Sequence, residues 1–492
     1  MPAGIVTAAR AASAQAGARM LAAGGNAADA TVATAFALTV ADPANCGIGG
    51  YGGNAVIDLG GTSRPLQVEF NTAAPAALEE RMLEQAPRRD SFIYGGMSVS
   101  RPSVVAGLRR IHDRFGRMPW ADVLAPAIEL AGDGVLTGPD LARAFAWARR
   151  KPEAIGPDFW CCFAFEPDFE PDFEPDIVTE TCRLRQPALC DTLKRIASEG
   201  ASAFESGPLV DAVTQAVQRA RGVLRSEDLA DHEVGECPAT EFRFGDASIY
   251  GPRLETTGIG VLMAALGSAG HRQWPAVRDA AYIQRVAAAP REAWKSRLAE
   301  VRPLVASAQA TQHTTHLRAA DEDGTLVSLT FTHGPLWFGS ALAAPGTGII
   351  LNCGVNLLVH ELRTGRRIAR TNLTPVVAHA DDGARHALGT PGGYRIPAAM
   401  MTALIDVLAS DCPLSDALAR PRIATNMQGD LEVEEELAAA ARGARTMGSE
   451  EFYGPASGIT LTPDGKMLGA RDQRFHNAVA FVDRGGTISL TE

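Results

Sequence analysis

The order of the predicted elements places this chain of 492 residues in the α+β class, with layers of helices packed on sheets. Helical spacing dominates the first half of the chain. Short alternating or apolar runs, separated by Gly and Asp turns, begin near residue 314. Helices then return toward the C-terminal end. This order in blocks differs from the regular strand–helix alternation of a parallel βα protein.

The N-terminal region is predicted to form two helices over residues 7–42, interrupted at Gly24-Gly25-Asn26, where a C-cap precedes a new N-cap. The following segment, PANCGIGGYGGNAVIDL, is predicted to be a glycine loop that runs into a strand. Its glycines have the spacing of a dinucleotide fingerprint, but the loop lies between a helix and a strand, the reverse of the order required. A loop for close backbone approach is therefore the preferred interpretation.

The middle of the chain is predicted to be mostly helical over residues 121–150 and 184–230. Between them, the repeat FEPDFEPDFEPD (165–176) has too many prolines for a helix and lacks the spacing of a calcium loop, so we expect an extended acidic surface loop. Further on, the predicted strands are TTHLRAAD, TLVSLTFT, TPVVAHAD and RHALGT. The predicted helices after them are IPAAMMTALIDVLA and LSDALARP.

Composition limits the possible partners and cofactors. The net charge of −11 argues against a nucleic-acid partner or an anionic membrane surface. The first residues lack the pattern of a signal peptide, and the longest apolar run is too short for a membrane span, so we expect a cytoplasmic protein, or a periplasmic one if a leader has been removed. The eight scattered cysteines form no C-x-x-C and are expected to be reduced. We expect no cofactor and no metal.

The segment TQHTTHLRAADEDGTLVSLTFTHG (311–334) is predicted to be a β-hairpin. DEDG is a turn signal, and Gly324 suits the left-handed position of a three-residue loop. If Asp321 pairs with Thr325, then Thr314 lies opposite Thr332 on the same face. Facing hydroxyls suit a nucleophile and its orienting partner, but they are equally an ordinary cross-strand threonine pair.

A metal site at the same segment is the weaker alternative. His313 and His316 are three residues apart on a strand, so their side chains are expected to point to opposite faces. No HExxH motif and no dense group of His, Asp and Glu accompanies them. His313 is therefore expected to act locally or to have no role.

Several stretches, in this order, resemble the γ-glutamyltranspeptidase family of N-terminal nucleophile hydrolases over nearly the full chain. They are MLAAGGNAADATVATAFALTV, DPANCGIGGYGG, RQPALCDTLKRIASEGASAFESGPL, RGVLRSEDLADH, TTHLRAADEDGTLVSLT, FGSALAAPGTGIILN, NLTPVV, GTPGGYRI and LGARDQRFHNAVA. The resemblance implies one four-layer αββα sandwich over residues 1–492. It also implies self-cleavage before the first threonine of the Thr-Thr-His motif.

Carried onto this chain, the resemblance places the cleaved bond between His313 and Thr314, which gives a large segment 1–313 and a small segment 314–492. The freed α-amine of Thr314, which titrates near about pH 8, is then the general base for its own hydroxyl. Thr332 matches the threonine that hydrogen-bonds the nucleophile. Gly392 and Gly393 match the glycines whose N–H groups form the oxyanion hole.

The positions that bind the γ-glutamyl zwitterion in the family differ in this chain. The matching residues are Asn71 in place of an arginine, Gly334 in place of an asparagine, Gly354 and Leu357 in place of a glutamine and an acid, and Thr371 and Asn372 in place of a serine pair. Because losing one charged partner of a buried pair costs on the order of several kcal/mol, efficient γ-glutamyl transfer is not expected. Arg318, Arg370 and Arg395 are candidate replacement anchors.

The sequence therefore predicts an autoprocessing threonine amide hydrolase that acts on a small non-γ-glutamyl amide. In its altered γ-glutamyl-binding positions the chain resembles relatives within the family such as oxamate amidohydrolases and cephalosporin acylases. A true γ-glutamyltransferase, or glutathione hydrolase, and a non-catalytic family member are the two alternatives. The expected partners are the small amide, the two segments of one precursor bound to each other, and a possible homodimer of processed heterodimers.

Overall fold

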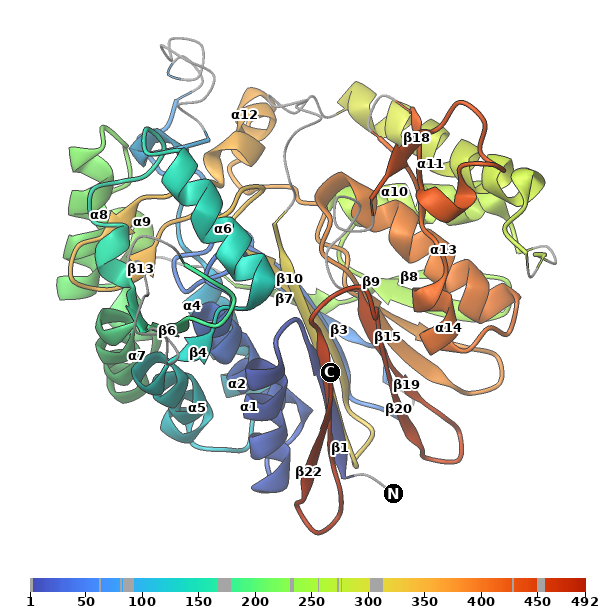
Figure 1. The fold of residues 1–492 in the computed structure, drawn as a ribbon, viewed down its shortest axis with the longest axis horizontal. Coiled ribbons are helices and arrows are strands. Elements are labelled where there is room, and N and C mark those ends of the chain that lie inside the picture. The colour runs from blue at the N-terminus through green and yellow to red at the C-terminus, as the bar shows by residue number, and fades with distance from the viewer. Residues whose placement is uncertain are drawn as a thin grey trace.

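The computed structural model has four layers in the order helices, sheet, sheet, helices (Figure 1). The αββα class of fold predicted from the resemblance is confirmed. The structure describes residues 3–492 except 62, 80–81, 83–92, 167–177, 231–233, 255, 272–273, 276, 301–312, 427–428 and 449–455.

The first sheet is antiparallel throughout and has eight strands. Their spatial order is β22 (Ile488–Thr491), β21 (Ala478–Val482), β1 (Gly4–Ala8), β10 (Thr315–Asp321), β11 (Leu326–Thr332), β2 (Gly52–Asp58), β3 (Leu66–Glu69) and β7 (Gly235–Pro238). The hairpin β10–β11 thus lies at the centre of the sheet, between strands from the N-terminal part of the chain.

The second sheet is also antiparallel and has six strands. Their order is β20 (Met467–Arg471), β19 (Ser457–Leu461), β15 (Arg385–Gly389), β14 (Val376–His379), β9 (Ala247–Gly251) and β8 (Thr240–Phe244). Three smaller sheets lie outside these two. They are β4 (Val135–Leu136) with β6 (Arg183–Arg185) and β5 (Ala164–Glu166), β12 (Ala343–Ala344) with β13 (Ile349–Ile350), and β16 (Ile423–Thr425) with β17 (Leu431–Glu434) and β18 (Arg445–Met447).

Helices cover the outer face of each sheet (Figure 1). On the side of the first sheet lie α1 (Ala11–Ala22), α2 (Ala27–Ala41), α4 (Val104–Phe115), α5 (Trp120–Asp133), α6 (Gly138–Arg150), α7 (Pro187–Glu199), α8 (Pro208–Arg219) and α9 (Glu227–Ala230). On the side of the second sheet lie α10 (Thr257–Ala269), α11 (Ala280–Glu300), α13 (Ile396–Ala409) and α14 (Leu414–Ala419). The helix α12 (Val355–Arg363) lies near the top of the view.

Alternation along the strands separates the core into layers. In β1, Ile5 packs between the two sheets, whereas Val6 packs under the helices. In β10, Ala320 belongs to the layer between the sheets, and Leu317 and Ala319 belong to the helical layer. Even-numbered residues of β10 therefore face the second sheet, and this alternation directs Thr314 toward that interface.

The structure corrects the predicted start of the first helix. Thr7 and the residue after it belong to β1, because this apolar stretch pairs with both β10 and β21 at the centre of the sheet. The break between the two helices is as predicted, since Asn26 accepts hydrogen bonds at 3.0 Å from the Ala28 and Asp29 N–H groups and caps α2.

The predicted helices and strands after residue 314 are confirmed, and α13 spans the predicted segment IPAAMMTALIDVLA. Strands over residues 235–251 and the helices α10 and α11 were not anticipated. Most of the acidic repeat, residues 167–176, lies outside the described residues. Within the described part of the chain, no helix combines the length and apolar character needed to cross a bilayer.

Candidate active site

The hairpin has the register that its turn predicts. Thr315 pairs with Phe331 and Ala320 pairs with Leu326, so one further step places Thr314 opposite Thr332. At the turn, the Asp321 N–H donates to the Thr325 carbonyl at 3.2 Å. Gly324 has a φ of 82°, the left-handed conformation that the loop requires.

The hydroxyl of Thr332 contacts the bond before Thr314. Its Oγ1 donates to the His313 carbonyl at 2.8 Å and accepts from the Gly334 N–H at 2.9 Å. A donor on this carbonyl draws electron density from its carbon, which makes that carbon easier for a neighbouring hydroxyl to attack. Thr314 is 9% exposed, so the residue is largely shielded from water.

The glycine loop packs against the same end of the hairpin. Gly52 pairs with Thr332, and the Tyr51 N–H donates to the Thr332 carbonyl at 3.1 Å. A Cβ on Gly50 would lie 2.7 Å from that carbonyl oxygen, and a Cβ on Gly52 would lie 2.0 Å from the Phe70 oxygen. Close backbone approach, rather than nucleotide binding, explains these glycines.

His316 joins the hairpin to the second sheet. Its ring lies 2.5 Å from Thr330 Oγ1 and 3.2 Å from Ser328 Oγ, and burial lowers its pKa well below the usual value. A Cβ on Gly389 would lie 1.9 Å from the ring, so only glycine fits at the end of β15. This contact anchors the loop that begins at Gly389 beside the strand that follows Thr314.

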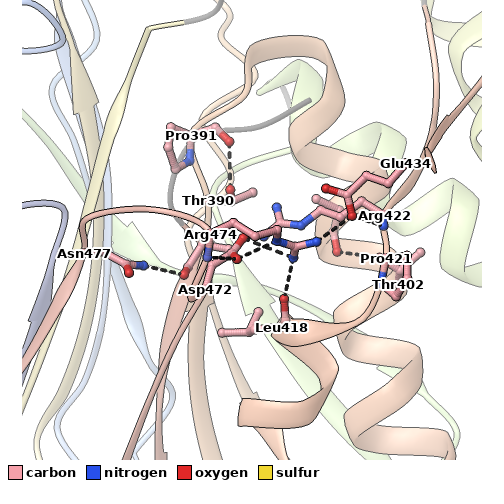
Figure 2. A network of polar contacts seen from close by, with 12 residues as sticks. Thr390, Pro391, Thr402, Leu418, Pro421, Arg422, Glu434, Asp472, Arg474 and Asn477 are labelled. Carbon is pink, nitrogen blue, oxygen red and sulfur yellow. Dashed lines mark hydrogen bonds and ion pairs between the residues drawn. The ribbon is translucent and has the colours of Figure 1, made fainter. Parts of the chain in front are cut away.

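Gly392 and Gly393 lie in that loop, directly before α13. Their φ angles are 136° and 54°, both in the region that favours glycine. Figure 2 shows Thr390 and Pro391 at the start of the loop, beside a buried network of arginines and carboxylates. The loop therefore runs from the His316 contact past this buried network.

Asn71 lies next to the hairpin end. A Cβ on Gly52 would be 3.0 Å from the Asn71 Cα, and Gly52 itself pairs with Thr332. Asn71 Nδ2 donates to Glu69 Oε1 at 3.0 Å. Its Oδ1 is buried and has no hydrogen-bond partner among the described residues. That oxygen is an acceptor available to a donor on a ligand.

At two other predicted pocket positions, Gly334 and Gly354, side chains of neighbouring residues occupy the space that a longer side chain would need. A Cβ on Gly334 would lie 2.4 Å from Cys353 Sγ, and the φ of Gly334 is 134°. A Cβ on Gly354 would lie 2.2 Å from Ser100 Oγ. Neither asparagine nor glutamine fits these positions without displacing Cys353 or Ser100.

The remaining predicted residues lie on α12 and on the segment before β14. Leu357 is half-buried on α12 and packs in an apolar cluster with Val355 and Leu358. The Thr371 carbonyl accepts from the Gly258 N–H at 3.2 Å, and the Asn372 carbonyl accepts from the Thr374 hydroxyl at 2.8 Å. No described contact joins these three residues to Thr314.

The three candidate arginine anchors are bound within the protein. Arg370 pairs with the buried Glu361 at 2.7 Å, and Arg395 pairs with the buried Glu432 at 2.8 Å. Arg318 is fully buried between the sheets and donates to Thr7 Oγ1, Ser457 Oγ and the Gly389 carbonyl. These contacts argue against the expectation that one of the three replaces the family's arginine.

Sequence reasoning missed Asn352, whose side chain connects the glycine loop to the segments around Ser100 and Gly354. Its side chain accepts from Ser100 Oγ at 2.7 Å and the Gly354 N–H at 3.0 Å, and it donates to the Gly49 carbonyl at 3.0 Å. One buried amide thus joins the glycine loop to the segment after β13. All eight cysteines are free, and the described residues include no group of three His, Cys, Asp or Glu side chains that could hold a metal.

The hydroxyl of Thr315, the residue after Thr314, is expected to be dispensable for stability. Thr315 is fully buried on the helical side, and its Oγ1 has no hydrogen-bond partner in the described part of the chain. Thr315→Val removes a desolvated hydroxyl and is expected to leave the free energy of unfolding unchanged or to raise it by about 1 kcal/mol. Urea denaturation would measure it, and a loss of stability would show that the hydroxyl has a stabilising partner.

Buried histidines predict lower stability in acid. Burial lowers the pKa of His333 to about 3 and that of His386 to about 4, whereas an unfolded histidine titrates near about 6.5. The unfolded state therefore takes up protons first. The free energy of unfolding is expected to fall as pH drops from 6.5 toward 4, by on the order of 1 kcal/mol per pH unit for each histidine.

Urea denaturation at pH 7.5 and at pH 5 would measure this loss. In His386→Gln the dependence on pH is expected to be weaker, because one of the buried histidines with a depressed pKa is gone. An unfolding free energy that is equal at the two pH values would contradict the prediction.

Comparison with known proteins gives a consistent family. The sequence model described as Gamma-glutamyltranspeptidase matches residues 13–302 and 275–482. The Acylase ACY 1 proenzyme of Pseudomonas sp. (strain V22) is 30% identical, with 96% of this chain and 92% of that protein covered. The Glutathione hydrolase proenzyme of Pseudomonas aeruginosa is 27% identical, with 82% and 80% covered. Cephalosporin acylase from Bacillus halodurans shares the fold, with a TM-score of 0.84, 23% identity and coverage of 97% and 96%.

Proposed function

Because the chain belongs to the γ-glutamyltranspeptidase family of N-terminal nucleophile hydrolases and acyltransferases, we propose that Thr314 is its nucleophile, first in self-cleavage and then on an amide substrate. The observation that carries this proposal is the hydrogen bond of 2.8 Å from Thr332 Oγ1 to the His313 carbonyl, opposite Thr314. A polarised carbonyl directly before a threonine is the arrangement that self-cleavage needs.

Self-cleavage proceeds by an N-to-O acyl shift. Thr314 Oγ attacks the His313 carbonyl carbon, the C–N bond breaks, and the hydroxyl proton ends on the Thr314 nitrogen. Water then hydrolyses the ester, which leaves a carboxylic acid on His313 and a free amine on Thr314. That amine titrates near about pH 8, so at neutral pH it can take the proton of its own hydroxyl when a substrate is attacked.

The two segments produced by this cut, 1–313 and 314–492, remain one αββα domain in this proposal. The support is the sheet order, since β10 pairs with β1 and β11 pairs with β2. Both segments thus contribute strands to one sheet, and many backbone hydrogen bonds hold them together after the peptide bond is lost.

Gly392 and Gly393 are the proposed oxyanion donors. Their backbone conformations and the anchoring of their loop at His316 support this role. Backbone N–H groups without side chains allow a substrate carbonyl to approach closely.

The acyl group of the substrate is proposed to differ from γ-glutamyl. Cys353 and Ser100 occupy the space beside Gly334 and Gly354, and Asn71 is bound to Glu69 where the family has an arginine. A zwitterion would enter this site without its usual charged partners, and an unpaired buried charge is costly. Asn71 and Gly334, which lie at the end of the hairpin, are the proposed acyl-binding positions nearest to Thr314. Leu357, Thr371 and Asn372 are proposed to lie farther along the substrate.

A turnover comparison tests this proposal. Processed wild type is offered γ-glutamyl-p-nitroanilide and p-nitroanilides of simple carboxylic acids, and release of p-nitroaniline is followed. We expect kcat/KM for at least one simple acyl group to exceed that for γ-glutamyl by about tenfold or more, as loss of one buried polar match implies. A preference for γ-glutamyl, together with turnover of glutathione, would instead establish a glutathione hydrolase.

A further inference from the structure

Aromatic rings lead from helix α6 to the bond before Thr314. The His313 ring stacks on Trp337, with centroids 4.5 Å apart and an angle of 24° between the planes. Trp337 contacts Trp147 at 6.0 Å, and Trp147 stacks on Tyr94 at 6.1 Å. We call Trp337, Trp147 and Tyr94 the aromatic shelf. All three are half-buried.

The aromatic shelf is held in place from beneath. Trp147 lies on α6, two residues after Phe145, and Phe145 packs against Phe338 at 5.1 Å. Phe338 is fully buried, has a left-handed φ of 59°, and donates its N–H to the Ala44 carbonyl at 2.8 Å. Phe338 therefore anchors the backbone next to Trp337, and the Trp337 ring packs against the same apolar cluster.

In the uncut chain the His313 ring occupies the aromatic shelf. The properties of this ring indicate which kind of ligand the aromatic shelf accepts. His313 supplies the acyl group that Thr314 attacks, so the His313 ring is the side chain of that acyl group. Burial lowers the pKa of His313 to about 3, which keeps the ring neutral. Its Nε2 is buried and has no hydrogen-bond partner among the described residues. The aromatic shelf thus receives a flat, uncharged ring by its face.

Cleavage is expected to weaken the contact between His313 and the aromatic shelf. It leaves a carboxylate on His313 beside an apolar aromatic surface, where a charge without a partner is unfavourable. Once His313 has left, Trp337 would be uncovered next to the nucleophile, on the acyl side of the attacked bond.

We infer that the aromatic shelf is the acyl-side specificity surface of the processed protein, and that it selects amides whose acyl group ends in a flat, uncharged aromatic or heteroaromatic ring. This inference rests on the proposed function and names the substrate class of the same site. Trp337 is its central residue.

Two p-nitroanilides with the same leaving group test the inference. The acyl groups are 3-phenylpropanoyl and hexanoyl, and the variants are Trp337→Leu and the control Trp160→Leu. Trp160 is another half-buried tryptophan of the same apolar cluster. The measured quantity is the ratio of kcat/KM for the two substrates. It does not depend on the processed fraction, so slower self-cleavage of a variant does not affect it.

We expect wild type and Trp160→Leu to prefer the 3-phenylpropanoyl amide by about fivefold, the size of one aromatic stacking contact. Trp337→Leu is expected to bring the ratio close to one, and Trp337→Phe to retain most of the preference. Equal turnover by wild type, or a preference that survives Trp337→Leu, would overturn the inference and leave the hydrolase intact.

If processed wild type hydrolyses neither amide, calorimetric titration with 3-phenylpropanoate and hexanoate decides the matter separately. Tighter binding of the aromatic acid that is lost in Trp337→Leu supports the aromatic shelf as a binding surface, while hydrolysis of amides with this aromatic acyl group is refuted. Equal or absent binding of the two acids overturns the aromatic shelf.

Discussion

Replacing Thr314 by alanine is expected to leave the protein as one chain of 492 residues, whereas wild type is expected to separate into segments 1–313 and 314–492. Alanine removes the only atom of this side chain that can attack the His313 carbonyl, and the polarising hydrogen bond from Thr332 remains. The loss of cleavage is therefore expected to be complete. Intact mass of the two purified proteins, with a denaturing gel, measures it.

Three matched variants separate chemistry from folding. Thr314→Ser keeps a hydroxyl and is expected to self-cleave, whereas Thr315→Val leaves the nucleophile untouched and is also expected to self-cleave. Thr332→Val removes the donor to the His313 carbonyl and is expected to slow cleavage by about 100-fold, the usual effect of losing one such donor. A folded wild type that stays whole at neutral pH, or a Thr314→Ala protein that splits, would refute the assignment of Thr314.

The second large effect is expected at Asp472, which is fully buried beside β20. Figure 2 shows its carboxylate between two arginines, Arg422 and Arg474. Arg474 also pairs with Glu434 at 2.5 Å and donates to the Leu418 carbonyl at 2.8 Å. Asp472→Ala removes the carboxylate that both cations share and is expected to lower the free energy of unfolding by about 3–5 kcal/mol.

Urea denaturation of precursor protein, in the Thr314→Ala background, would measure this loss without interference from cleavage. The control is Asp464→Ala, which breaks an exposed pair with Lys466. Because water screens that pair, the midpoint of unfolding is expected to stay within experimental error. Equal effects of the two substitutions would contradict the view that the buried network is a structural support.

The network also gives a structural role to LGARDQRFHNAVA, the C-terminal stretch that resembles the family. Asp472 and Arg474 lie beneath the loop that carries Gly392 and Gly393, and Asn477 donates to the Ala456 carbonyl at 2.9 Å (Figure 2). Such residues appear in the sequence only as polar positions near the end of the chain. Their burial becomes evident once β19 and β20 are seen to pair beside β15.

Local patterns predicted the elements whose causes are local. The turn at Gly324 sets the hairpin register through adjacent residues, so the placement of Thr314 opposite Thr332 could be derived without a structure. The short strand β1 could not, because a mostly apolar run of five residues does not distinguish a buried strand from the start of a helix. The strands of residues 235–251 were likewise missed, since their partners lie far away in the chain.

The sequence by itself determined the class of fold, the family, the hairpin and the bond expected to be cut. Its motifs are contiguous, and contiguous residues meet whatever the rest of the chain does. Only the tertiary structure decided that Cys353 closes on Gly334, that three candidate arginines have partners inside the protein, and that the His313 ring lies on Trp337. These contacts join segments distant in sequence, and long-range packing, rather than local propensity, sets the shape of a pocket.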